Sequence, residues 1–143
     1  MIVLDASAAI NMINGTEAGM ALRTLLLQGE RSIAPSLYCA EVCNAFWKYA
    51  QAGIVTPDIA RARAQASLTL VDEFVNLDPL YAEALSEACR LAHSVYDMFY
   101  LVLARRNAAT LFTLDAKLRS LCEANGVNVV SLVGLPKEDL RDV

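Results

Sequence analysis

No apolar run in this sequence is long enough to cross a membrane, although apolar residues are abundant. They make up 56% of the 143 residues, and the mean hydropathy is +0.38. The longest unbroken apolar stretch runs only from Met98 to Ala104, whereas a membrane-spanning helix needs roughly 18 such residues. The opening residues Met1 to Asp5 include no lysine or arginine, so we expect no signal peptide and a cytoplasmic protein. The surplus of apolar residues predicts a surface that a second copy or a partner covers.

Zinc ligands are scarce as well. The sequence has one histidine, His93, and no C-x-x-C pair, which argues against a zinc site. Cys39 and Cys43 stand four residues apart on an expected helix, a spacing at which they could bind a metal ion. All four lie in apolar stretches, however, and we interpret them as buried structural thiols: Cys39, Cys43, Cys89 and Cys122.

Positive charge is not in excess. The net charge is −4 and the pI is about 4.9, which argues against a protein that coats nucleic acid with a basic surface. It does not exclude a nuclease, because acidic metal ligands count as negative until the cation binds.

Short apolar segments alternate with helical patterns along the whole chain. Strands are expected at residues 2–4, 32–34, 75–77, 110–112 and 127–130, and helices at 6–13, 17–28, 36–51, 56–74, 78–92, 94–106 and 116–124. We expect residues 1–143 to form one domain, because no repeat or linker interrupts them. The alternation is typical of an α/β fold whose parallel sheet is covered by helices on both faces.

Two aspartates stand where strands of such a sheet would end. Asp5 directly follows the first expected strand, and Asp115 comes soon after the fourth. Ligands bind beyond the carboxyl ends of the strands in open parallel sheets, which favours a site role for both. Each also precedes an expected helix, so the alternative of a helix N-cap stays open.

Asp97 opens an expected helix that is apolar nearly all round. The run from Ser94 to Asp97 fits an S-x-x-D capping box, which is one interpretation of this acid. The helix continues with the apolar run from Met98 to Leu103 and must therefore be buried against other elements. We expect Asp97 to face a crevice rather than open water.

Glu41 interrupts an apolar helix at a position that capping cannot explain. At 100° per residue it shares a narrow stripe with Leu37, Asn44 and Lys48. The stripe is either an ordinary solvent face or the lining of a polar cleft. In the second interpretation Glu41 is a ligand, Asn44 its hydrogen-bond partner and Lys48 a phosphate contact.

Together the four acids indicate a metal site. Clustered carboxylates repel one another unless protons or cations intervene. Oxygen-only ligands suit Mg²⁺ or Mn²⁺, which take their remaining ligands from water and substrate phosphate. The candidate ligands are Asp5, Glu41, Asp97 and Asp115.

With these residues in view, the chain resembles the PIN-domain family, specifically the VapC-like toxins of bacterial toxin–antitoxin pairs. The resemblance covers essentially the whole chain and rests on four motifs in the right order: Ile2-Val3-Leu4-Asp5-Ala6-Ser7, Glu41-Val42-Cys43-Asn44-Ala45, Tyr96-Asp97-Met98-Phe99-Tyr100-Leu101-Val102-Leu103-Ala104 and Thr113-Leu114-Asp115-Ala116-Lys117-Leu118. Each motif is weak alone, and their joint order is fairly specific.

The resemblance implies a three-layer α/β/α sandwich with a central parallel sheet of four to five strands in the order 3-2-1-4-5. It implies an endoribonuclease that hydrolyses RNA with Mg²⁺ or Mn²⁺ held by the acidic quartet, which Ser7, Asn44 and Thr113 support. It also implies a homodimer that a cognate antitoxin silences, and residues 52–74 are our expected partner-facing segment. The alternative is a non-catalytic PIN-like module for RNA binding or assembly.

Contacts to RNA must come from local basic residues, since the chain as a whole is acidic. Lys48, Lys117 and Arg119 lie on elements near the expected cleft and are our candidates. Tyr100 could stack on a base, but its spacing from apolar neighbours favours a place in the core, and His93 is interpreted as structural too.

Overall fold

A parallel sheet of four strands forms the centre of the molecule. The computed structural model describes residues 1–132, so residues 133–143 of the expected domain lie outside the described residues. The strands are β1 (Ile2–Leu4), β2 (Ser32–Pro35), β3 (Glu73–Val75) and β4 (Thr110–Phe112), in the spatial order β3-β2-β1-β4. Every neighbouring pair is parallel, which confirms the α/β class that the alternating pattern predicted.

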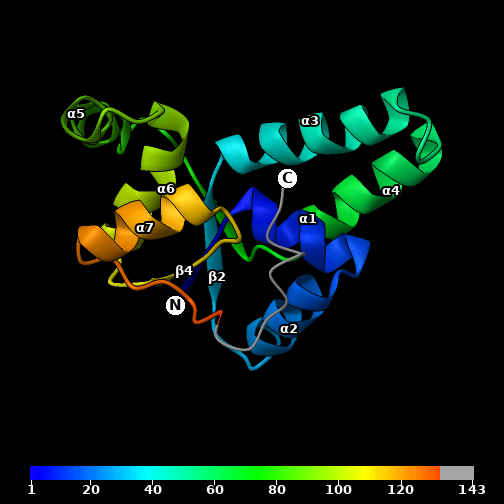
Figure 1. Ribbon diagram of the computed structural model, residues 1–143, viewed down its shortest axis with the longest axis horizontal. Coiled ribbons are helices and arrows are strands. Elements are labelled where there is room, and N and C mark those ends of the chain that lie inside the picture. The colour runs from blue at the N-terminus through cyan, green and yellow to red at the C-terminus, as the bar shows by residue number, and fades with distance from the viewer. Residues whose placement is uncertain (133–143) are drawn as a thin grey trace.

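Helices cover both faces of this sheet. Within residues 1–132 they are α1 (Ala6–Asn14), α2 (Glu17–Leu26), α3 (Leu37–Gln51), α4 (Pro57–Leu68), α5 (Tyr81–Leu91), α6 (Val95–Arg106) and α7 (Ala116–Ala124). In Figure 1, α5, α6 and α7 lie on one side of the strands and α1 to α4 on the other, which gives the three-layer α/β/α arrangement. In this described part of the chain, no helix is long and apolar enough to cross a membrane.

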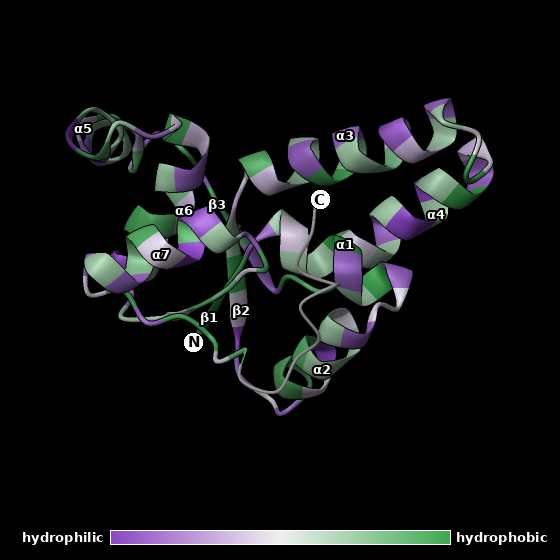
Figure 2. Cartoon of the chain, in the orientation of Figure 1, coloured by the Kyte–Doolittle hydropathy of each residue, from purple (hydrophilic) through white to green (hydrophobic). Residues whose placement is uncertain are grey.

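The middle of the sheet and α6 form the core. Val3 and Leu4 of β1 are fully buried between β2 and β4. α6 packs on β1, β2 and β4, and its residues from Met98 to Ala104 are all buried, as expected of a helix that is apolar nearly all round. Figure 2 shows the contrast with α3 and α4, along which hydrophobic and hydrophilic residues alternate. Asp5 therefore directly follows a buried strand, and Asp97 lies in the first turn of a helix that is largely buried.

The expected boundaries of the fourth helix and the third strand are wrong. The pattern predicted a helix over 56–74 and a strand over 75–77, whereas α4 ends at Leu68 and β3 spans Glu73–Val75. Long-range pairing with β2 explains the difference. The backbone N–H of Asp72 donates to the Ser32 carbonyl, and the Asp72 carboxylate accepts from the Ser32 N–H. Such tertiary bonds override the local periodicity from which the helix was predicted.

The fifth strand, expected at 127–130, is reduced to a single parallel bridge between Leu111 and Val129. Two backbone bonds hold it: the Leu111 N–H donates to the Asn128 carbonyl at 2.8 Å, and the Val130 N–H donates to the Leu111 carbonyl at 3.0 Å. The segment thus runs beside β4, where the order 3-2-1-4-5 puts a fifth strand, but its pairing is too short to count as one.

The expectation of four buried thiols is also wrong. Cys39, Cys43 and Cys89 are exposed, and only Cys122 is buried. The apolar residues beside the exposed cysteines point in other directions, because successive residues of a helix are rotated by about 100°. Apolar neighbours in the sequence therefore did not predict burial here.

Candidate functional site

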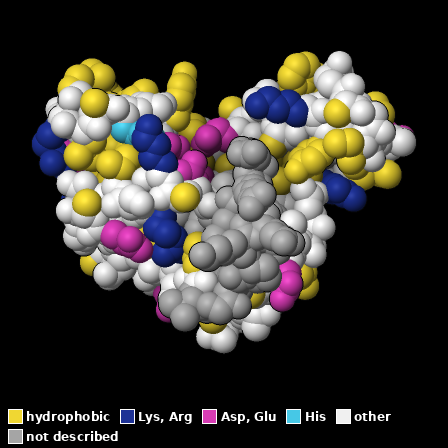
Figure 3. All heavy atoms as spheres, in the orientation of Figure 1, with side chains coloured by type: hydrophobic (Ala, Val, Ile, Leu, Met, Phe, Trp, Pro, Cys, Tyr) yellow, Lys and Arg dark blue, Asp and Glu magenta, His cyan; other side chains and the backbone are white. Residues whose placement is uncertain are grey.

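The four predicted acids line one cavity. Asp5, Glu41, Asp97 and Asp115 all border a cleft of about 490 Å³. They come from four places in the fold: the end of β1, the middle of α3, the first turn of α6 and the N-cap of α7. Figure 3 shows acidic side chains gathered in a notch between the α5–α7 side of the molecule and the arm formed by α3 and α4. The convergence that the sequence could only suggest is therefore present in the structure.

Asp5 is the most buried of the four and does not act as a helix cap. It stands at the N-cap position of α1 but makes no side-chain capping bond, so that alternative is wrong. Its Oδ2 instead accepts hydrogen bonds from Ser7 Oγ at 2.7 Å and from Thr113 Oγ1 at 2.6 Å. With only 5% of the residue exposed, burial raises the pKa of Asp5 to about 6, although the Thr113 and Ser7 hydrogen bonds act in the opposite direction.

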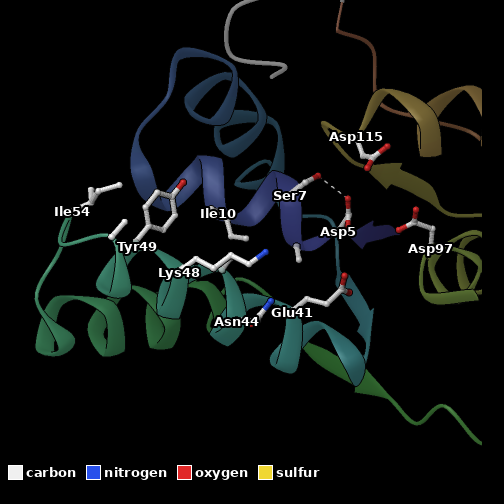
Figure 4. Close-up of a pocket in the computed structure, with 13 residues that line it drawn as sticks. Asp5, Ser7, Ile10, Glu41, Asn44, Lys48, Tyr49, Ile54, Asp97 and Asp115 are labelled. Carbon is white, nitrogen blue, oxygen red and sulfur yellow. Dashed lines mark hydrogen bonds between the residues drawn. The ribbon is translucent and has the colours of Figure 1, made fainter. Parts of the chain in front are cut away.

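Ser7 and Thr113 also join the ends of β1 and β4. Ser7 Oγ accepts from the Leu114 N–H at 3.1 Å, and Thr113 Oγ1 accepts from the Asp115 N–H at 3.0 Å. The two hydroxyls thereby fix the position of Asp5 relative to the loop that carries Asp115. Figure 4 shows Ser7, Asp5 and Asp115 beside one another at the acidic end of the cleft.

Glu41 lies on the wall of the cavity, together with its stripe neighbours Asn44 and Lys48. The structure thus places the polar stripe of α3 along the cleft, and the interpretation as an ordinary solvent face is insufficient. Glu41 Oε1 accepts a hydrogen bond from the hydroxyl of Tyr100 at 2.7 Å. Burial raises the pKa of Glu41 to about 7, against the effect of the Tyr100 bond, and the charges of Asp5 and Asp97 add to the rise.

Asp97 and Asp115 combine local bonds with a place in the cavity. Asp115 caps α7, because its Oδ1 accepts from the Leu118 N–H at 2.8 Å; this confirms the N-cap interpretation, and the residue also borders the cavity, where its role as a ligand stays a prediction. The capping box expected from Ser94 and Asp97 at the start of α6 does not form. Ser94 Oγ accepts from the Tyr96 N–H, whereas Asp97 Oδ2 lies 2.6 Å from His93 Nε2 in a hydrogen bond.

Among residues 1–132, one oxygen of each carboxylate accepts a hydrogen bond and the other has no partner. The held atoms are Asp5 Oδ2, Glu41 Oε1, Asp97 Oδ2 and Asp115 Oδ1. The second oxygen of each has no hydrogen-bond partner among residues 1–132. Carboxylates that bind metal ions are usually hydrogen-bonded through an oxygen in this manner, which leaves the other oxygen oriented for the cation.

The donor set fits a hard divalent cation. All the candidate ligands are oxygens, which suit Mg²⁺ or Mn²⁺ rather than a thiophilic metal. No three acidic, cysteine or histidine side chains within residues 1–132 stand close enough together to enclose an ion. Mg²⁺ does not require such a cage, since it keeps several waters and is often held by one or two carboxylates plus substrate phosphate.

Two predicted RNA contacts do not reach the cleft. Lys117 is exposed on α7, and neither it nor Arg119 borders the cavity. The guanidinium of Arg119 is engaged elsewhere, by the Glu123 carboxylate and the Val130 carbonyl. Of the three predicted basic residues only Lys48 lies on the cavity wall, and its amine points toward the acids in Figure 4.

Sequence reasoning missed two residues that touch the acids, His93 and Tyr100. The first carried only the signal of its closeness to Asp97 in the sequence, because His93 precedes the first residue of α6. The second carried none, since Tyr100 and Glu41 are 59 positions apart. From the sequence we interpreted both as structural residues.

Comparison with known proteins identifies the family. The PIN domain model matches residues 2–124. The chain is 32% identical over 123 residues to ribonuclease VapC3 of Pyrobaculum aerophilum, covering 82% of this chain and 91% of that one. It is 30% identical over 118 residues to ribonuclease VapC1 of Mycobacterium tuberculosis, covering 81% and 86%. The fold is similar to the crystal structure of PAE2754 from Pyrobaculum aerophilum, with a TM-score of 0.67, 25% identity and 90% of each chain covered. These matches confirm the resemblance that the four sequence motifs indicated: the chain belongs to the PIN domain family.

Proposed function

We propose that this protein is an Mg²⁺- or Mn²⁺-dependent endoribonuclease and the toxin of a toxin–antitoxin pair. The observation that carries the proposal is the set of four carboxylates in one cleft, each held through one oxygen while the other has no hydrogen-bond partner in the described part of the chain. A pure binding module has no use for such an arrangement, because the acids repel both RNA and one another. The VapC relatives, which are named ribonucleases, support RNA as the substrate.

The residues of the chain have separable roles in this chemistry. A divalent cation, when bound, supplies Lewis-acid stabilisation of the charge that grows on the phosphate and lowers the pKa of water. Asp5 would be the central ligand, since it follows a buried strand and is held by two hydroxyls. Asp97 and Glu41 would complete the ligand set, and Asp115 would hold a second ion or its waters. In the reaction a water oxygen bonds to phosphorus and one P–O ester bond breaks.

The cleft continues from the acids toward an apolar end. Tyr49 and Ile54 line that end, and Lys48, with Ile10 beside it, lies between that end and the acids. This arrangement suits an unpaired nucleotide whose scissile phosphate lies at the carboxylates and whose neighbouring base meets apolar surface. Unpaired RNA is the form whose bases can be splayed out in this way.

The proposal is tested by incubating purified, antitoxin-free protein with single-stranded RNA in EDTA, in Mg²⁺ and in Mn²⁺. We expect cleavage in either cation and none in EDTA, with restoration when the cation is added back. Protein that is folded and binds RNA but leaves it intact under all three conditions would favour the non-catalytic binding module. Equal cleavage with and without EDTA would contradict metal dependence.

Apolar surface on the α3–α4 arm fits the proposed homodimer and antitoxin. Trp47 is 56% exposed, Ile54 66% and Ile59 44%. Ile54 and Ile59 fall in the segment 52–74 that we expect to face a partner, and a partner that covered this arm would remove their apolar side chains from water.

Lys48 and Lys117 form a matched pair for testing the RNA contacts. Lys48→Ala is expected to raise KM for RNA about fivefold with little change in kcat, the effect of one exposed charge pair of about 1 kcal/mol. Lys117→Ala, outside the cavity lining, is expected to leave both constants close to those of the unaltered protein. The measurement is initial cleavage rate against RNA concentration at low salt. Equal changes in KM for the two variants would show that the lysine on the cavity wall contributes no more to RNA binding than the one outside it. The prediction for Lys48 would then be wrong.

A further inference from the structure

α6 provides more to the site than Asp97. Tyr100 lies three positions after Asp97 on the same helix, and His93 lies four positions before it, just ahead of the helix. Tyr100 and Asp97 share one side of α6, whereas His93 reaches Asp97 from the segment just before the helix. His93 Nε2 lies 2.6 Å from Asp97 Oδ2, and the Tyr100 hydroxyl donates to Glu41 Oε1 at 2.7 Å. The two side chains therefore each hold one oxygen of a different carboxylate.

The two contacts differ in their exposure to water. The side chain of His93 is 8% exposed and that of Asp97 25%, whereas Tyr100 is fully buried. A buried polar group without a partner is costly, so the Tyr100 bond in particular is strongly favoured over its absence. This bond also joins α6 to α3, and it sets which Glu41 oxygen is left toward the cavity.

We propose that His93 and Tyr100 are positioning residues that orient Asp97 and Glu41 for the divalent cation. The inference rests on the proposed function, because it concerns the same site. Neither residue touches the cation or RNA in this role; each fixes one carboxylate oxygen and so aims the other. The competing explanation is purely structural: the His93–Asp97 pair would stabilise the start of α6, and the Tyr100 hydroxyl would only satisfy a buried polar group.

The test measures Mn²⁺ affinity directly, from the loss of the free-ion signal in electron paramagnetic resonance, without RNA or turnover. The variants are His93→Ala, His93→Gln and Tyr100→Phe. Glutamine can place an amide nitrogen close to the position of His93 Nε2 and so keep the bond to Asp97. Tyr100→Phe removes one oxygen atom and keeps the ring in the core.

Two matched controls separate positioning from stability. Ser94→Ala removes the side chain that caps α6 without touching Asp97, and so should lower the melting temperature while leaving Mn²⁺ affinity unchanged. Tyr38→Phe removes another buried hydroxyl, which donates to the Ser67 carbonyl at 2.7 Å and to none of the four acids. It should likewise change stability alone.

We expect His93→Ala and Tyr100→Phe to weaken Mn²⁺ binding by roughly tenfold to hundredfold, the usual effect of removing such a partner, and His93→Gln to restore most of the affinity. Unchanged affinity in both His93→Ala and Tyr100→Phe, with metal-dependent cleavage intact in the unaltered protein, would overturn the inference and leave the proposed function standing. An unaltered protein that binds no Mn²⁺ would overturn both. Weakening of the same size in Ser94→Ala or Tyr38→Phe would reduce the effect to general loss of stability and overturn the positioning role.

Discussion

Replacing Asp5 by asparagine is expected to lower RNA cleavage at saturating Mg²⁺ by at least about 100-fold, more than the loss usual for a residue that only orients a ligand. The reason lies in the bonds that Asp5 already makes. The asparagine oxygen can keep the hydrogen bonds from Ser7 and Thr113, which then turns the amide nitrogen to the place of Asp5 Oδ1. A donor of hydrogen bonds would face the cation where a negatively charged oxygen stood before.

This loss should not come from unfolding. The pKa of Asp5 is raised by burial, which means that the ionised carboxylate is disfavoured where it lies and that a neutral amide fits better. Asp5→Asn is therefore expected to be at least as stable as the unaltered protein in EDTA at neutral pH. Stability gained where activity is lost is characteristic of a functional site.

The measurement is single-turnover cleavage of RNA, run beside circular dichroism to verify folding. Asp78→Asn is the matched control, since Asp78 is exposed in the turn before α5 and does not border the cleft. It should cleave at the rate of the unaltered protein. Full activity in Asp5→Asn would mean that cleavage comes from another site or a contaminant, and the carboxylate proposal would then be wrong.

The parts of the site that could be predicted are those whose signals are local. The apolar run before Asp5 identified a buried strand, and the apolar run from Met98 to Leu103 in α6 indicated that Asp97 faces a crevice; both interpretations depend only on the local pattern of apolar residues. The stripe of Glu41, Asn44 and Lys48 followed from the 100° rotation of a helix, and all three line the cavity. These residues could be placed because each element is regular and its neighbours in sequence define its faces.

The parts that could not be predicted depend on how elements meet. The bond from Tyr100 to Glu41 exists because α6 and α3 approach each other at one point, and nothing in either helix alone specifies that point. The same holds for β3, whose position is set by its pairing with β2 rather than by its own pattern. Arg119 was wrongly predicted to contact RNA in the cleft. Its place in the sequence suggested a role there, but its guanidinium instead bonds to the Glu123 carboxylate and the Val130 carbonyl.

Without metal, the protein is expected to become less stable as the pH rises from about 4 to 7. Asp5 has an ordinary pKa of 3.8 and one of about 6 in the folded protein, so between these values the folded state retains a proton that the unfolded chain has lost. Stability falls with pH wherever the folded state binds more protons. At about 1.4 kcal/mol for each pH unit between the two values, Asp5 alone accounts for ~3 kcal/mol. Glu41, with a pKa raised from 4.5 to about 7, extends the decline in the same direction.

Other shifted carboxylates do not cancel this decline. Hydrogen bonds from Arg90 and Arg105 lower the pKa of Glu87 to about 2, so Glu87 adds stability as the pH rises from about 2 to 4.5 and contributes no further change above that. The pKa of Glu83 is lowered in the same manner by its bonds to Arg105 and Arg106. The interval from pH 5 to 7 is therefore the one in which the cleft acids dominate.

Urea unfolding in EDTA at pH 5 and at pH 7.5 measures the part of this decline that lies above pH 5, and adding cation should reverse it. Mg²⁺ at about 100 times its Kd adds ~2.7 kcal/mol to the free energy of unfolding, and it should add less at pH 5, where protons compete for the same oxygens. Asp5→Asn should lose the Asp5 part of the pH dependence while keeping the part due to Glu41, and it should lose most of the response to Mg²⁺, whereas Asp78→Asn should keep the full pH dependence and the response to Mg²⁺. If the metal-free protein were more stable at pH 7.5 than at pH 5, ionisation of the cleft acids would not lower its stability. The electrostatic argument for a bound cation would then be wrong.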